Sequence, residues 1–126
     1  MKRATLEWID KAEGDWRVAQ REMQASEPVW DAICFHAQQC AEKYLKALLE
    51  EQGIAFGKTH DSVLLLSLTG GQLPEIDAKQ ADLGYLSPLG IVARYPGTET
   101  DPQMAANALR IAGEVRAIMR SRLGIP

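Results

Sequence analysis

The stretch from Pro28 to Gly53 constrains the fold more than any other part of this 126-residue chain. It has no Gly or Pro inside it, and it is rich in Ala, Leu, Lys, Glu and Gln, which favour helix. At about 100° per residue, apolar side chains occupy most of the circumference, and Phe35 falls nearly opposite the broadest apolar face. That face carries Trp30, Ile33, Ala37, Cys40, Ala41, Tyr44 and Leu48. We therefore expect the central helix of a bundle, or a helix that also meets a second subunit.

A first helix is predicted from about Thr5 to Met23, where apolar residues recur at three- and four-residue spacing. Thr5 is the expected N-cap, because its hydroxyl can accept from the first free backbone N–H groups. Gly14, inside this helix, suggests a place of close contact between helices. The central helix is expected to begin at Ser26-Glu27-Pro28, where Ser can cap and Pro fits the first turn.

Three shorter or later helices complete the predicted fold. A short apolar run after His60 is expected to be a helix capped by Thr59 or Asp61, because no second strand-like run exists to pair with it. A fourth helix begins near Pro74 and is expected to break near Pro88 and Gly90. The last helix follows the strong start signal Asp101-Pro102 and runs to about residue 123, with several Ala residues on its buried side.

The predicted fold is therefore an all-α, up-and-down bundle of about five helices in a single domain, residues 1–126. Short loops imply antiparallel neighbours, so the start of the third helix and the end of the fourth should share one end of the bundle. This geometry predicts that His60 and Arg94 lie together at the end toward which the C-terminus of the central helix points. The central helix itself is interpreted chiefly as scaffold.

Charge and hydropathy exclude some classes of protein. A net charge of −3 argues against a protein that coats nucleic acid through bulk charge, although a local basic site remains compatible with it. No apolar run approaches the roughly 20 residues of a membrane span, and the N-terminus shows no apolar signal segment. We expect a cytoplasmic protein without membrane contact.

Neither cysteine is expected to form a disulfide or to bind a metal. Cys34 and Cys40 lie six residues apart on one helix, roughly 9 Å along its axis, so they cannot form a disulfide with each other. His36 lies between them at spacings that do not make a helical metal site, and it is interpreted as a packing residue. No metal and no cofactor are predicted.

Three segments resemble the HEPN family (higher eukaryotes and prokaryotes nucleotide-binding domain). They are the run Phe35-His36-Ala37-Gln38-Gln39-x-Ala41-Glu42-Lys43-x-Leu45-Lys46-Ala47, then Lys58-Thr59-His60-Asp61, then Ala93-Arg94-Tyr95-Pro96. Trp8, Lys11-Ala12 and Asp15 also fit the opening of the family's pattern. The resemblance covers nearly the whole chain, from about residue 6 to residue 120.

This resemblance implies a helical bundle that is commonly a homodimer and is often encoded beside a small nucleotidyltransferase, in toxin–antitoxin-like pairs. Many members are metal-independent RNases, with an Arg followed four to six residues later by a His. The Arg would stabilise the charge on the phosphorane, and the His would transfer protons. Here no His follows Arg94 at any distance, which argues against autonomous catalysis.

The resemblance and the predicted geometry give a set of candidate ligand-binding residues. Arg94 would contact phosphate and Tyr95 would offer a stacking face, or else Arg94 would hold helix-terminal carbonyls or a carboxylate. His60, with Lys58 nearby, could form a polar pocket with Arg94, or it could make a local hydrogen bond to Asp61 or a loop carbonyl.

Two further sets of charged residues have alternative interpretations. Glu42 and Lys43 are interpreted as a solvated or interface pair. The last helix carries Arg110, Arg116, Arg120 and Arg122 against Glu114. These arginines could complement the helix dipole, or form a basic stripe for RNA or an acidic partner.

Three functional hypotheses follow. The first is a HEPN-type nucleotide- or RNA-binding protein that partners a nucleotidyltransferase without catalysing a reaction itself. The second is an endoribonuclease toxin that uses Arg94 with a displaced His60. The third is an adaptor bundle with no nucleic-acid role.

Overall fold

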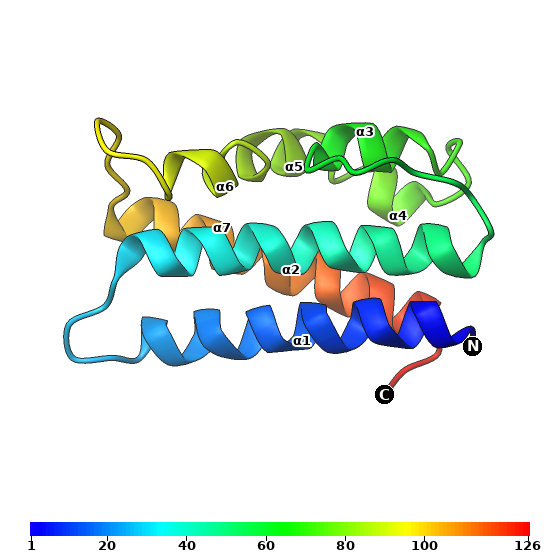
Figure 1. Cartoon of the computed structure of the whole chain (residues 1–126), viewed down its shortest axis with the longest axis horizontal. Helices are drawn as coiled ribbons and strands as arrows, with labels where there is room; N and C mark the ends of the chain where they lie inside the picture. Colours follow the sequence, from blue (N-terminus) through cyan, green and yellow to red (C-terminus); the bar gives the residue numbers. More distant parts are fainter.

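The computed structural model is an all-helical bundle, which confirms the predicted fold class. Seven helices follow in the order α1 (Arg3–Met23), α2 (Trp30–Glu51), α3 (Ser62–Ser67), α4 (Pro74–Asp77), α5 (Gln80–Leu86), α6 (Leu89–Val92) and α7 (Pro102–Arg122). Figure 1 shows α1 and α2 side by side and antiparallel, with α7 crossing behind them. The short helices α3 to α6 form a further layer, on the side of α2 away from α1.

Helix α2 is the central helix, as its apolar circumference predicts. It packs against α1, α3, α6 and α7, and more than half of its residues are buried. Its fully buried side chains include Ile33, Tyr44, Leu45 and Leu49. The core continues into α7, where Ala105, Ala108 and Ala112 have no exposed surface. Gly53 follows α2 with a φ of 69°, the left-handed conformation that terminates helices.

Neither residue predicted to cap the first two helices does so. α1 begins at Arg3 rather than at Thr5, and the buried Thr5 hydroxyl donates a hydrogen bond to the Glu51 carboxylate at 2.9 Å. Thr5 therefore joins the start of α1 to the end of α2. α2 begins at Trp30 without a side-chain cap, so Ser26 lies in the preceding turn.

Both polar caps predicted for the later helices are present. Asp61 accepts hydrogen bonds from the backbone N–H groups of Val63 and Leu64, and Asp101 accepts one from Met104. The predicted fourth helix is instead three short helices. The break between α5 and α6 lies near Pro88, as expected, whereas the break at Ala78–Lys79 carries no Gly or Pro and was not predicted.

The close contact between helices lies at Gly113 rather than at Gly14. A Cβ atom at Gly14 would meet nothing within 4 Å, whereas one at Gly113 would lie 3.0 Å from the ring of Trp16. Gly113 therefore lets α7 approach α1. None of the seven helices is long and apolar enough to cross a membrane.

The path between α2 and α3 differs from the predicted up-and-down order. Figure 1 shows the connection leaving the end of α2 and running back along it before α3 begins. His60 therefore lies over Glu42, in the middle of α2, rather than beyond the helix end. This return path is what brings the 58–61 segment close to α6.

Candidate functional site

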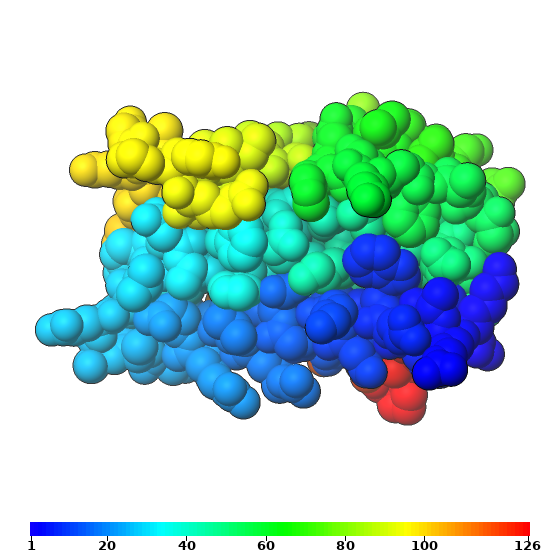
Figure 2. Space-filling view, viewed as in Figure 1, coloured from blue at the N-terminus to red at the C-terminus, as the bar shows by residue number.

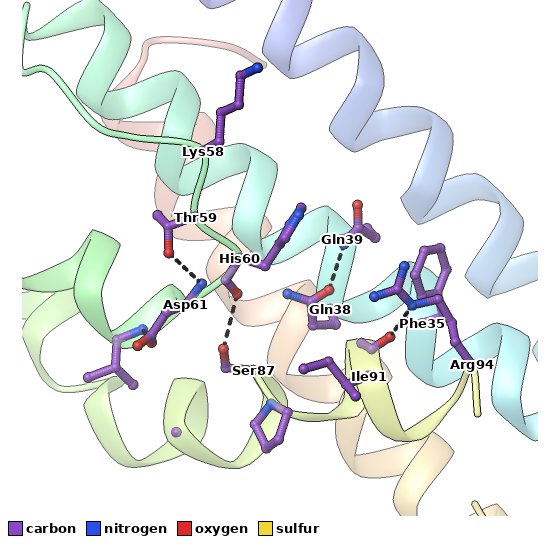
Figure 3. Close-up of a pocket in the computed structure, with 14 residues that line it drawn as sticks. Phe35, Gln38, Gln39, Lys58, Thr59, His60, Asp61, Ser87, Ile91 and Arg94 are labelled. Atoms are coloured by element: carbon purple, nitrogen blue, oxygen red, sulfur yellow. Dashed lines mark hydrogen bonds between the residues drawn. The ribbon is translucent and has the colours of Figure 1, made fainter. Parts of the chain in front are cut away.

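A pocket of about 640 Å³ lies on the face where α2 meets the 58–61 segment and α6. Figure 2 shows atoms of α2 (cyan) at the surface between the segment around α6 (yellow) and the segment before α3 (green). Figure 3 shows the side chains that surround the pocket. Fourteen residues line it, namely Phe35, Gln38, Gln39, Lys58, Thr59, His60, Asp61, Val63, Gly84, Ser87, Pro88, Gly90, Ile91 and Arg94.

Three of the four predicted binding residues line this one pocket. Lys58 and His60 come from the segment before α3, and Arg94 follows α6. Tyr95 does not line it; its ring centroid lies 5.9 Å from the Arg94 guanidinium, and the side chain is exposed. The pocket is on the side of the bundle, over the middle of α2, so the prediction of a site at the bundle end is wrong. The reason is the return path of the chain after α2.

Arg94 is held from two sides. Its Nε donates to the carbonyl of Gly90 at 2.8 Å, and its guanidinium lies 5.5 Å from the centroid of the Phe35 ring. The first contact is the helix-terminal role expected for Arg94. Because Arg94 has no ion-pair partner in the protein, its terminal nitrogens remain available to an anion.

Gly90 makes this arrangement possible. It is buried, and a Cβ atom there would lie 2.6 Å from the Oε1 atom of Gln38. Only glycine lets α6 approach α2 this closely without displacing Gln38. Gly90 therefore fixes the distance between Arg94 and the pocket wall formed by α2.

His60 is anchored to α2 rather than to its own turn. Its Nδ1 lies 3.1 Å from Oε1 and 3.2 Å from Oε2 of Glu42, and its carbonyl accepts from the Ser87 hydroxyl at 3.2 Å. The expected local hydrogen bond to Asp61 or a loop carbonyl is absent, because Asp61 caps α3. The His60 side chain is 73% exposed and lines the pocket.

Glu42 and Lys43 do not form the expected surface pair. Glu42 is buried and accepts from Lys46 Nζ at 3.2 Å and from Gln38 Nε2 at 3.1 Å. Lys43 instead donates to Asp15 of α1 at 2.6 Å. The i, i+4 spacing of Gln38, Glu42 and Lys46 puts all three on one stripe of α2, which faces His60.

The scaffold interpretation of α2 was incomplete. Phe35, Gln38 and Gln39 line the pocket, and Gln39 Nε2 donates to Gln38 Oε1 at 2.8 Å. All three belong to the run that carries the family resemblance. Two adjacent amides between apolar neighbours were the available signal, because their polar groups need partners or a ligand.

The remaining candidates from the sequence hold no comparable site. His36 is partly buried and its Nδ1 pairs with Asp15 at 2.8 Å. Cys34 and Cys40 are buried free thiols. Burial raises the pKa of Cys34 to about 11 and raises that of Cys40 further, so neither thiolate forms readily at neutral pH. No group of three or more His, Cys, Asp or Glu side chains is placed to hold a metal ion.

The arginines of α7 do not form a free basic stripe, because each has an acceptor in the protein. Arg116 donates two hydrogen bonds to Glu13, at 2.7 and 2.8 Å, and Arg120 lies 3.4 Å from the same carboxylate. Arg110 pairs with Glu114 at 2.7 Å, and Arg122 with Glu75 at 3.5 Å. Arg116, Arg120 and Arg122 connect α7 to other helices, and Arg110 also lies 3.7 Å from Asp82 of α5.

Comparison with known proteins agrees with this fold. The family model described as HEPN domain matches residues 5–122. TT1696 from Thermus thermophilus superposes with a TM-score of 0.79 at 26% identity, covering 96% of this chain and 99% of that one. ST0689, an archaeal HEPN homologue, superposes with a TM-score of 0.73 at 26% identity, covering 97% and 98%. Comparison with curated proteins gives no match. The family match spans nearly the whole chain, and the chain therefore belongs to the HEPN domain family.

Proposed function

We propose that this chain is a cytoplasmic, single-domain HEPN protein that binds the phosphate of a nucleotide or of RNA in the α2–α6 pocket. In this proposal it works as a homodimer and as the partner of a minimal nucleotidyltransferase, in a toxin–antitoxin-like pair, and does not cleave RNA itself. The observation that carries the proposal is the placement of Lys58, His60 and Arg94 around one pocket.

The charges around the pocket favour an anionic ligand. The carboxylate of Asp61 is used by the backbone N–H groups of α3, and the carboxylate of Glu42 is buried against Lys46. Lys58 and Arg94 have no such partner, and both line the pocket. Figure 3 shows the Arg94 guanidinium beside Phe35, whereas the Lys58 side chain extends away from Arg94. A phosphate group in the pocket would gain a charge-assisted contact from the Arg94 guanidinium, and Lys58 would add positive charge nearby.

The aromatic and amide groups favour a nucleotide over free phosphate. Phe35 offers a ring beside Arg94, and ring stacking is the usual way in which proteins hold a base without reading its sequence. The amide of Gln39 lies on the same wall and can bond to a base edge or a ribose hydroxyl.

The test is equilibrium binding of AMP and of a short 5′-phosphorylated RNA to the purified full chain, with inorganic phosphate as the reference ligand. We expect AMP to bind more tightly than phosphate, and Arg94→Ala to weaken both. Saturable binding of none of the three ligands would refute the proposal and favour the adaptor hypothesis.

A specific observation favours an endoribonuclease as the second candidate. Arg94 and His60 line the same pocket, so a proton-transfer group and a charge-stabilising group are both present although the family's His after Arg94 is missing. RNA cleavage by the parent that is lost in both Arg94→Ala and His60→Ala would establish this alternative. Absence of cleavage in the parent would exclude it.

The two partner proposals are tested separately. Light scattering coupled to gel filtration measures the oligomeric state, for which we expect twice the 13.9 kDa of one chain. The neighbouring reading frame should encode a nucleotidyltransferase with a Gly-Ser motif, and that protein should co-purify with this chain. A monomer, or a neighbour of another class, would contradict the corresponding proposal.

A further inference from the structure

We propose that Glu42 is the positioning residue of His60: it fixes the ring tautomer in which Nδ1 carries the proton and Nε2 is presented to the ligand pocket. This inference rests on the proposed phosphate-binding role of the pocket. It assigns a function to a buried charged residue that the pocket lining itself does not include.

Burial makes Glu42 an unusual choice for a residue that only packs. Its side chain is 2% exposed, and that of Lys46 is 7% exposed. Taking two charges out of water costs several kcal/mol per ion, and apolar side chains of similar volume often replace such pairs without loss of stability. Stability alone therefore does not account for a carboxylate at this position.

Both carboxylate oxygens of Glu42 accept hydrogen bonds from neighbouring side chains. Gln38 Nε2 bonds to Oε1, Lys46 Nζ bonds to Oε2, and His60 Nδ1 lies between the two oxygens. The Lys46 ammonium packs against two aromatic rings, with Nζ 5.3 Å from the centroid of the Trp8 ring and 6.0 Å from that of the Phe56 ring. The carboxylate is thus fixed in place before any ligand arrives.

The chemistry of a carboxylate sets the tautomer. An ionised carboxylate only accepts hydrogen bonds, so Nδ1 of the neutral His60 ring must donate and Nε2 must keep its lone pair. Nε2 has no partner within the protein and belongs to a ring that lines the pocket. When the ring takes up a proton, Nε2–H becomes a donor for a phosphate oxygen while Glu42 remains the acceptor on the other side.

The variant Glu42→Gln tests this directly, because it keeps the shape of the side chain and replaces one of its two acceptor oxygens with a donor. Lys46 Nζ donates to Oε2 and Gln38 Nε2 donates to Oε1, and Nδ1 of His60 lies within 3.2 Å of both oxygens. The carboxylate offers Nδ1 two acceptors, whereas the amide of the variant offers it one acceptor and one donor. Glu42→Gln therefore no longer forces Nδ1 to donate, and the proton can move to Nε2.

The experiment uses ¹⁵N-histidine labelling of the full chain and long-range ¹H–¹⁵N correlation spectra, which distinguish protonated from bare ring nitrogens. The chain has only two histidines, and His36 provides the matched control because its Nδ1 bonds to Asp15 at 2.8 Å. We expect both rings in the Nδ1–H form in the parent. Glu42→Gln should raise the population of the Nε2–H form of His60 alone, and Asp15→Asn should change only His36.

AMP binding is measured on the same proteins. Losing a charge-assisted partner should weaken AMP binding about tenfold in Glu42→Gln and leave it unchanged in Asp15→Asn. If Glu42 only anchors the loop, Glu42→Gln keeps the parent's tautomer and the parent's affinity, and the proposal is overturned. An altered His60 tautomer with unchanged AMP affinity also overturns it. A parent that binds no AMP, but whose His60 tautomer still follows Glu42, refutes the proposed function and leaves the positioning role standing.

Discussion

Cations on one side of this bundle are paired with carboxylates, whereas those on another side are not. Where α1, α2 and α7 meet, Glu13 accepts from Arg116 and Tyr44 and lies close to Arg120. Around the α2–α6 pocket, Lys58 and Arg94 have no carboxylate partner. The difference separates charges that hold helices together from charges that remain available to a ligand. It also shows why counting basic residues along α7 gave a misleading candidate surface.

The largest expected effect is on stability, at the ion pairs where α1, α2 and α7 meet. Glu13→Ala removes the shared acceptor of two arginines and a tyrosine, and we expect it to lower the free energy of unfolding by about 2–3 kcal/mol. The loss is smaller than that of a fully buried pair because the Glu13 side chain is only partly buried. Urea denaturation measures this. AMP binding by the folded variant should equal the parent's. A loss of AMP affinity would show that the two sides are coupled and would break the comparison.

Gly90→Ala tests whether the pocket depends on close packing. The added Cβ would overlap the Gln38 amide, and such overpacking costs about 1–3 kcal/mol. We expect reduced stability together with weaker AMP binding, because α6 carries Arg94 away from α2. Gly14→Ala is the control, since a Cβ there meets nothing within 4 Å and Gly14 does not line the pocket. Equal effects of both substitutions would contradict the role given to Gly90.

Arg94→Ala should change binding and leave stability nearly unchanged. Loss of a charge-assisted contact predicts AMP binding weaker by about tenfold or more, and a change in unfolding free energy within about 0.5 kcal/mol. Calorimetric titration and urea denaturation measure the two quantities. Arg94→Lys keeps the charge without the planar fork and should recover only part of the affinity. A large loss of stability in Arg94→Ala would place Arg94 with the structural arginines of α7.

The pH dependence of stability separates Glu13 from the pocket. The hydrogen bonds from Arg116 hold the pKa of Glu13 below its ordinary value of 4.5. A lowered folded-state pKa contributes stability that is present above the unfolded pKa and is lost as the pH falls through the folded pKa. The stability difference between the parent and Glu13→Gln should therefore be greatest at neutral pH and shrink below pH 4.5. Urea denaturation across this range measures it, and a constant difference would refute the assignment.

Local signals were enough to predict most of the fold. Three kinds of signal depend only on neighbouring residues, and the structure contains all of them. They are the uninterrupted run of helix-forming residues in α2, the caps at Asp61 and Asp101, and the break near Pro88. The break at Ala78–Lys79 lacks a Gly or Pro signal. α4 and α5 each pack against α7, and such long-range contacts are not encoded in the local sequence.

The site was only partly predictable, for a related reason. The motifs indicated His60, Lys58 and Arg94, and the structure brings these three to one pocket. The predicted location of the site at the bundle end was wrong, because a loop can run back along a helix as readily as it can turn at the helix end. The burial of Glu42 was missed because it depends on Lys46, Gln38 and His60 meeting at one point.

The smallest expected effect is that of Lys58→Ala. Lys58 is exposed on a flexible stem, so its contact with a phosphate is worth about as much as a surface ion pair, and AMP binding should weaken only about two- to fivefold. Lys11→Ala is the control, because Lys11 is also exposed but does not line the pocket. At about 1 M salt the effect of Lys58→Ala should vanish, since the Debye length falls to about 3 Å. The effect of Arg94→Ala should persist, because the Arg94 guanidinium is held in place by Phe35 and Gly90 and offers directed hydrogen bonds as well as charge. If salt abolished both effects equally, Arg94 would act as a diffuse surface charge, and the contrast between a built site and ordinary surface cations would fail.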